Sequence, residues 1–227
     1  MTKVSVVIPV YNHWELTHSL LYDLYNHCRT DLDEVLVVNN GSKQIEHYTG
    51  MKWWAQGKML PIHELELETN VGFLKASNAG IKHAKGDIII LISNDVQIQE
   101  NIVKKIVDAL KQHNVLVGAR LLSGDTGWNT FGKKTFPYLE GWLLAAMASD
   151  WDILGGFDER FAPHDYEDID LSTTAIDKGY ALVPLEGSKV RHLGGKTIGF
   201  SPEREKITRA NQEKFKDKWV KKSKSSA

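Results

Sequence analysis

Short apolar runs alternate with helical patterns through the first half of the chain, and this alternation limits the fold more than any other feature. Strands are expected at residues 3–8, 34–38, 62–67, 88–92 and 115–119. Apolar side chains at helical spacing predict intervening helices near residues 16–25, 45–55, 74–84 and 102–110. Such an alternation is typical of a mainly parallel central sheet with helices on both faces. The sequence therefore predicts the α/β fold class.

The second half of the chain follows a less regular pattern. Residues 121–137 are rich in Gly, Ser, Thr and Asn, which indicates a loop or a short hairpin. Strands are expected at 141–147, 180–184 and 188–192. Helices are expected at 150–157, in the segment that ends at Lys178, and at 202–222. These patterns predict one domain over residues 1–200, followed by a C-terminal helix and basic tail over 201–227.

Charge, cysteine content and hydropathy limit the class of protein. The formal net charge is −1, so no overall field favours nucleic acid or an anionic membrane. The single cysteine, Cys28, cannot form an intramolecular disulfide and favours a reducing, cytoplasmic setting. No apolar run is long enough to span a bilayer, so any membrane role is expected to be peripheral, at the inner face of the membrane.

The turn after the first predicted strand excludes two common nucleotide-binding loops. It reads Pro9-Val10-Tyr11-Asn12-His13 and contains no glycine. The GxGxxG fingerprint and the Walker loop both need glycines at this turn. Asn12, with Glu15 three residues later, instead predicts a helix cap.

A single carboxylate follows the strand predicted at 88–92, in the sequence Ser93-Asn94-Asp95. Ligands of open α/β sheets bind outside the carboxyl ends of the strands. In a chain without a cysteine cluster, Asp95 at that edge indicates a divalent cation held by oxygen ligands and phosphates. The alternative is an ordinary turn, because Ser, Asn and Asp all favour turns.

A second group of acids lies at the start of the helix predicted to end before Lys178. It comprises Asp165, Glu167, Asp168 and Asp170. One explanation is that these acids complement the helix dipole. Four acids so close together exceed that need, and their mutual repulsion would raise at least one pKa and so favour a general base. Asp170 points about 200° around the helix from Asp168, so a structural role is expected for it.

Five segments, taken in order, resemble the family 2 inverting glycosyltransferases of the GT-A fold. They are VVIPVYN at 6–12, VVNNGS at 37–42, NVGF at 70–73 with NAG at 78–80, LISNDV at 91–96, and the run from GGFDERF at 155–161 through YEDIDL at 166–171 to VRH at 190–192. The last run is most similar to the rhamnosyltransferase-like branch. The resemblance implies a hexosyl- or deoxyhexosyltransferase with a nucleotide-sugar-binding half over 1–97 and an acceptor-binding, catalytic half over 98–200.

The resemblance places the donor-binding residues at the ends of the predicted strands and on the helix at 74–84. They are Pro9, Tyr11, Asn12, Asn39, Asn40, Lys75, Ser93 and Asn94. Asn39 stands where the family often has an Asp that bonds to a pyrimidine, and Ser93 stands where it has the first acid of an Asp-x-Asp motif. An amide oxygen still accepts a hydrogen bond from a pyrimidine N–H. A UDP- or dTDP-sugar is therefore the expected donor.

The same resemblance implies that Asp95 and His192 hold the cation. A set that includes imidazole is compatible with Mn²⁺, and Mg²⁺ is the alternative metal. A structural histidine, hydrogen-bonded within the fold, is the alternative interpretation of His192.

The resemblance also makes Asp168 the general base, with Glu167 binding the acceptor. Trp142 is a candidate for the acceptor wall because sugars stack on aromatic faces, and core packing is the alternative for it. The expected acceptor is a saccharide or lipid-linked saccharide. Nucleic acid is a second candidate because lysines recur between residues 214 and 224. Apolar residues at four-residue spacing in the same segment predict instead a helix that docks one face and leaves its lysines in solvent. A non-catalytic module that binds nucleotide sugars is a further alternative.

Overall fold

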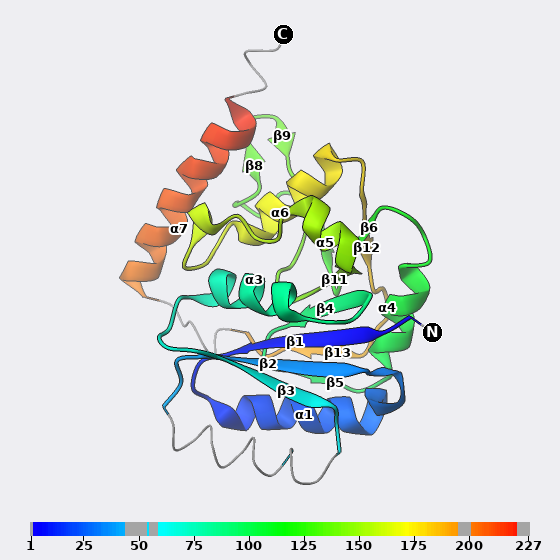
Figure 1. Ribbon diagram of the computed structural model, residues 1–227. Coiled ribbons are helices and arrows are strands. Elements are labelled where there is room, and N and C mark those ends of the chain that lie inside the picture. Colours follow the sequence, from blue (N-terminus) through cyan, green and yellow to red (C-terminus); the bar gives the residue numbers. More distant parts are fainter. Residues whose placement is uncertain (1, 44–53, 55–58, 195–200, 222–227) are drawn as a thin grey trace.

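A seven-stranded sheet runs through the protein in the order β12-β6-β11-β4-β1-β2-β3 (Figure 1). The computed structural model describes residues 2–43, 54, 59–194 and 201–221. The parallel strands β1 to β4 span Val4–Val10, Glu34–Asn40, Ile62–Leu67 and Ile88–Ile92. β11 (Leu143–Met147) runs antiparallel between β4 and β6 (Val115–Gly118), and β12 (Ala181–Pro184) is parallel to β6. The predicted α/β class with a mainly parallel sheet is confirmed.

Apolar cores lie against both faces of this sheet, because successive strand side chains point to opposite sides. On β1, Val6 and Ile8 belong to a core shared with α1 (Trp14–Cys28) and α4 (Ile102–Ala109). Val7, between them, belongs to the other core. The helices of that second core are α3 (Phe73–His83), α5 (Ala148–Leu154), α6 (Glu167–Asp177) and α7 (Pro202–Phe215) (Figure 1).

A two-stranded sheet outside the large one joins distant parts of the chain. β5 (Val96–Ile98) pairs antiparallel with β13 (Val190–His192), and His192 lies opposite Val96. The sequence predicted β13 but not β5, because three residues are too few to show a strand period. This pairing brings His192 beside Asp95.

Residues 121–139 form two nested hairpins. β7 (Leu121–Leu122) pairs with β10 (Tyr138–Leu139), and β8 (Thr130–Phe131) pairs with β9 (Lys134–Thr135) inside it. The hairpin alternative for this region is confirmed. The helix expected at 45–55 lies outside the described residues, apart from Trp54, which is helical and buried.

The ends of two helices differ from expectation. The N-cap residue of α1 is His13, and none of the described side chains caps this helix. Asn12 has a left-handed backbone, with φ of 54°, and its Oδ1 accepts from the Lys43 N–H at 3.1 Å. The predicted cap is therefore wrong, because the Asn12 side chain bonds to the segment after β2. The predicted final helix is α7 followed by a π-helical turn at Lys216–Val220. Among the described residues, no helix combines the length and apolarity needed to cross a membrane.

Candidate active site

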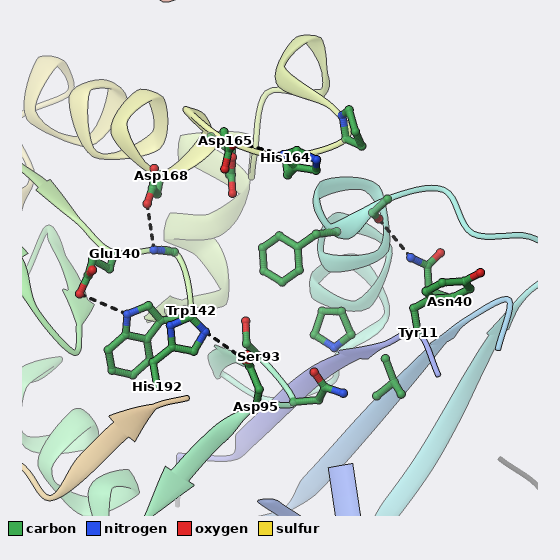
Figure 2. Close-up of a pocket in the computed structure, with 18 of the residues that line it drawn as sticks. Tyr11, Asn40, Ser93, Asp95, Glu140, Trp142, His164, Asp165, Asp168 and His192 are labelled. Carbon is green, nitrogen blue, oxygen red and sulfur yellow. Dashed lines mark hydrogen bonds and ion pairs between the residues drawn. The ribbon is translucent and has the colours of Figure 1, made fainter. Parts of the chain in front are cut away.

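A cavity of about 720 Å³ lies where β1, β2 and β4 reach their carboxyl ends (Figure 2). This is the edge at which open α/β sheets bind ligands. The cavity brings together ten of the residues singled out from the sequence, which are Pro9, Tyr11, Asn40, Ser93, Asn94, Asp95, Trp142, Glu167, Asp168 and His192. They come from segments of the chain that are far apart in sequence.

Asn40 holds a loop against this cavity. Its Nδ2 donates to Asn70 Oδ1 at 2.9 Å and to the Gly72 carbonyl at 3.3 Å, and its Oδ1 accepts from the Val71 N–H at 2.9 Å. Gly72 has a φ of 87°, and a Cβ there would lie 3.0 Å from Pro163 Cβ. Glycine at this position therefore lets the loop approach the acid-bearing segment across the cavity.

The other three predicted donor residues lie outside the cavity lining. Asn39 is buried, and its Oδ1 accepts from the Ser42 N–H at 2.9 Å. The Asn12 N–H donates to Ser42 Oγ at 2.8 Å. Asn12 and Asn39 thus both engage Ser42, after β2. Lys75 is exposed on α3.

Asp95 and His192 form a close pair at one wall of the cavity (Figure 2). His192 Nε2 lies 3.1 Å from Asp95 Oδ1, and the Asp95 side chain is 5% exposed. The His192 ring stacks on Trp142, with centroids 5.2 Å apart and planes 12° apart. Trp142 is fixed in turn, because its carbonyl accepts from the Ser93 N–H at 2.9 Å and its Nε1 donates to Glu140 at 3.2 Å. The pair is therefore held by strand pairing and by an aromatic stack.

Asp168 lies across the cavity from this pair (Figure 2). Its Oδ2 accepts from the Gly141 N–H at 3.2 Å, and its Oδ1 accepts from the Ile169 N–H at 2.8 Å. Burial raises the pKa of Asp168 to about 6, in spite of these two hydrogen bonds, which favour the charged form. A carboxyl group with such a pKa can accept a proton near neutral pH.

Glu167, which precedes Asp168, is buried, with 8% of its surface exposed. Burial, and then the charge of Asp168, raise the pKa of Glu167 well above its usual range. Its Oε2 is buried without a hydrogen-bond partner among the described residues. Buried polar atoms are rarely left unpaired, so this oxygen is suited to bond with a molecule that enters the cavity.

Asp165 differs from Glu167 and Asp168 because its carboxylate is bound by side chains of α7. Arg204 Nη2 and Nε donate to its carboxylate at 2.8 and 3.2 Å, and Thr208 Oγ1 donates at 2.6 Å. Burial alone would raise the pKa of Asp165, but the close contact with His164 Nδ1 at 3.2 Å and the hydrogen bonds from Arg204 and Thr208 outweigh it and lower this pKa. Asp170 is directed elsewhere, because it accepts from Lys218 Nζ at 2.8 Å and from Trp219 Nε1 at 2.6 Å. These contacts give Asp170 the structural role expected for it.

Sequence reasoning missed several of the residues that line the cavity, among them Glu140, His164 and Arg204. Glu140 directly precedes the Gly141-Trp142 pair, and its charge next to a predicted strand was the one available signal. Arg204 is 39 residues from Asp165 in the sequence, so no local pattern connects them.

The charges around the cavity leave an excess of acid. The described lining residues include one arginine, Arg204, and five acids, of which Glu167 favours its neutral form because its pKa is raised; the other four are Asp95, Glu140, Asp165 and Asp168. A diphosphate would be repelled by this set unless a cation entered with it. The described part of the chain holds no group of three or more side chains suited to a metal ion. The Asp95–His192 pair fits a cation that takes its remaining ligands from phosphate and water.

A second cavity, of about 710 Å³, adjoins this site and shares Glu140, Trp142 and His192 with it. Its other lining residues come mainly from two segments, 119–123 and 184–191. The Trp142–His192 stack thus borders both spaces.

The fold and the site together define a GT-A glycosyltransferase scaffold, with a mainly parallel sheet whose carboxyl edge carries the cavity and its acids. The chain belongs to glycosyl transferase family 2, whose family model matches residues 5–165. The resemblance drawn from the sequence motifs is thereby confirmed.

Known relatives are distant. An uncharacterized protein of Mycobacterium tuberculosis is 24% identical over 218 residues, covering 87% of this chain and 76% of its own. The dolichol-phosphate mannosyltransferase of Pyrococcus furiosus is 26% identical, over 54% of this chain and 34% of its own. The undecaprenyl-phosphate 4-deoxy-4-formamido-L-arabinose transferase of Sodalis glossinidius is 29% identical, over 56% of this chain and 39% of its own.

Solved structures share the fold at low identity. A mannosyltransferase of Pyrobaculum calidifontis, in complex with GDP-Man and Mn²⁺, has a TM-score of 0.66 and 23% identity, covering 81% of this chain and 54% of its own. GalNAc-T7, with UDP, GalNAc and Mn²⁺, has a TM-score of 0.77 and 17% identity, and the match covers 99% of this chain and 50% of its own. The chain therefore spans about half the length of these two structures.

Proposed function

We propose that the protein is a metal-dependent, inverting glycosyltransferase that moves a sugar from a nucleotide-diphosphate sugar to an acceptor hydroxyl. One observation carries this proposal. The same cavity holds Asp168, a carboxyl group with a raised pKa, and the separate Asp95–His192 pair across from it (Figure 2). Transfer in a single displacement needs one base for the acceptor and one charged site for the leaving diphosphate.

Asp168 is the proposed general base. The acceptor oxygen forms its bond to the anomeric carbon as the bond from that carbon to the diphosphate oxygen breaks, and Asp168 takes the hydroxyl proton. The Gly141 and Ile169 N–H groups fix the direction of the carboxylate. Attack from the face opposite to the leaving group inverts the anomeric centre. Glu167, with its unpaired Oε2, is proposed to accept a hydrogen bond from another acceptor hydroxyl.

Asp95 and His192 would hold a divalent cation, Mn²⁺ in preference to Mg²⁺, because an imidazole favours the more borderline ion. When bound, such an ion neutralises charge on the departing diphosphate. Two of the structures that share the fold were solved with Mn²⁺. The acid excess of the cavity supports the same requirement, since Arg204, the one arginine among the described lining residues, is already paired with Asp165.

Pro9, Tyr11, Asn40, Ser93 and Asn94 are proposed to contact the donor directly, because they line the cavity near the ends of β1, β2 and β4. Asn12 and Asn39 would act through Ser42, and Lys75 would reach the donor only from the surface of α3. We expect UDP- or dTDP-sugars as donors, carrying a hexose or deoxyhexose.

The proposed acceptor is a saccharide or a lipid-linked saccharide. Trp142 offers an aromatic surface beside Glu140, at the border of the two cavities. Two of the relatives bear names that refer to polyprenyl phosphates. A nucleic-acid acceptor is less favoured, because several C-terminal lysines are occupied in ion pairs. These are Lys216 with Glu213, Lys218 with Asp158 and Asp170, and Lys221 with Asp217.

A panel of UDP-, dTDP- and GDP-sugars tests the proposal, with nucleotide release scored in Mn²⁺, in Mg²⁺ and in EDTA. We expect release with at least one donor and loss of release in EDTA. The variant Asp95→Ala should need at least about 10-fold more Mn²⁺ or lose activity, whereas His83→Gln, on the surface of α3, should behave as wild type. Nucleotide binding with no turnover of any donor would favour the binding-module alternative.

A further inference from the structure

Three side chains of α7 hold the loop that carries the acids of the active site. This group, here called the α7 clasp, consists of Arg204, Thr208 and Asn211. Arg204 and Thr208 both bond to the Asp165 carboxylate. The Asn211 side-chain nitrogen lies 2.7, 2.8 and 3.0 Å from the carbonyl oxygens of Phe161, His164 and Asp165. Asn211 is 1% exposed, so little water can reach these carbonyl oxygens to donate in place of its side-chain nitrogen.

The loop needs such support because its backbone is unfavourable. Asp165 and Tyr166 both have left-handed conformations, with φ of 70° and 76°. Consecutive non-glycine residues in this region cost free energy and persist only where surrounding contacts hold them. Tyr166 is the N-cap residue of α6 and provides no side-chain cap. Glu167 and Asp168 follow immediately, so the direction of both acids depends on these two residues.

We propose that Thr208 and Asn211 are positioning residues that orient Glu167 and Asp168 for transfer. The inference rests on the proposed role of Asp168. It assigns a catalytic task to a helix that begins at Pro202, beyond residue 165, where the match to the family model ends. Arg204 completes the clasp and also lines the cavity.

The clasp is separate from the residues proposed to hold the donor. Those residues lie at the ends of β1, β2 and β4, directly before β5, and in β13, whereas the clasp contacts residues 161–165. Loosening the clasp should therefore lower kcat and leave the donor KM nearly unchanged. A general loss of folding would instead affect both.

The test compares Thr208→Val, which removes the hydroxyl while keeping the side-chain shape, with Thr208→Ser, which keeps the hydroxyl. Asn211→Leu removes the amide donor, and Arg209→Gln, which breaks only an exposed pair with Glu205, is the matched control on α7. We expect kcat to fall about 10- to 100-fold in Thr208→Val and Asn211→Leu, since small misplacements of catalytic groups have effects of this size. Thr208→Ser and Arg209→Gln should stay within about 2-fold of wild type in kcat, because each keeps the clasp bonds.

Hydrogen exchange of the peptide that covers residues 161–170 provides a readout independent of turnover. It should be faster in Thr208→Val than in Thr208→Ser or Arg209→Gln, because a loosened loop opens more often. Unchanged kcat or unchanged exchange in folded Thr208→Val would overturn the inference, as would a parallel loss of kcat and donor binding. Should Asn211→Leu not fold, Thr208→Val alone decides. If wild-type protein transfers no sugar from any donor, the proposed function fails, while exchange still decides whether α7 holds the loop.

Discussion

Asp168 gives the site a defined pH dependence. Its pKa is raised to about 6 by burial, and the charges of Glu140 and Asp165 raise it further. A general base must be ionised to act, so we expect kcat to rise as pH increases through about 6 and then to level off. Initial rates at saturating donor and Mn²⁺ would measure this profile. The exposed-acid variant Asp177→Asn should leave it unchanged, and a rate that declines as pH rises through this range would contradict the assignment.

The same carboxyl group should reduce the stability of the fold above neutral pH. The folded pKa of Asp168, about 6, exceeds its ordinary value of 3.8, so the fold favours the protonated form. Unfolding free energy is therefore lost as pH rises from the ordinary value through about 6. We expect Asp168→Asn to be more stable than wild type by about 1–3 kcal/mol at about pH 8, with the difference shrinking towards pH 4. Urea denaturation at both pH values would measure it, and a variant less stable at the higher pH would refute this account.

The sequence identified single residues best where a motif is linear. Asp95, Asp168 and His192 each sit in a short recognisable run, and all three line the cavity. Arg204 could not be found in this way, because it reaches the site through a tertiary contact with Asp165. The chemistry of an acid is visible in sequence, whereas the partner that sets its charge state often is not.

At the scale of elements, α3 is packed unusually close to the sheet. A Cβ added to Gly80 would lie 2.4 Å from Val7 Cγ1 and 2.7 Å from Val38 Cγ2. We expect Gly80→Ala to lower the unfolding free energy by about 1–3 kcal/mol, because the helix must move away from β1 and β2. Chemical denaturation would measure the loss. Gly124→Ala is the control, since a Cβ there meets nothing within 4 Å; equal effects of the two substitutions would show that crowding is not the cause.

Two of the segments that resemble the family, residues 78–80 and 155–161, join elements of the fold. Asn78 Nδ2 donates to the Phe157 carbonyl at 2.8 Å, and its Oδ1 accepts from the Phe157 N–H at 2.9 Å. This pair of bonds fixes α3 to the turn after α5. The long helix α1, with its periodic apolar face, and the continuously apolar strand β4 were predicted well from sequence. β5 and the short strands between residues 121 and 139 were not predicted individually, because two or three residues carry no period and pair only in the folded chain.

At the scale of the whole molecule, Asp170 ties α6 to the end of the chain. It is 2% exposed and bonds to Lys218 and Trp219. We expect Asp170→Ala to destabilise the fold by about 1–3 kcal/mol, because Trp219 Nε1 loses its acceptor and Lys218 is left with Asp158 as its ion-pair partner. Trypsin should then cleave within residues 201–221 faster than in wild type. Asp177→Ala, an exposed acid on the same helix, is the control, and equal cleavage rates in the two variants would contradict a tethering role.

Residues 119–142 leave the large sheet at the end of β6 and return at the start of β11, and these two strands are neighbours, with Leu144 opposite Gly118. Because the sheet holds both ends together, a change in the length of this segment adds little loop-closure entropy. The segment supplies Tyr138 and Trp142 to the cavity, whereas β1 to β4 are not part of this segment. Insertions and deletions there would remodel the proposed acceptor side of the site and spare the strands proposed to hold the donor, so evolution could change the acceptor without rebuilding the donor site.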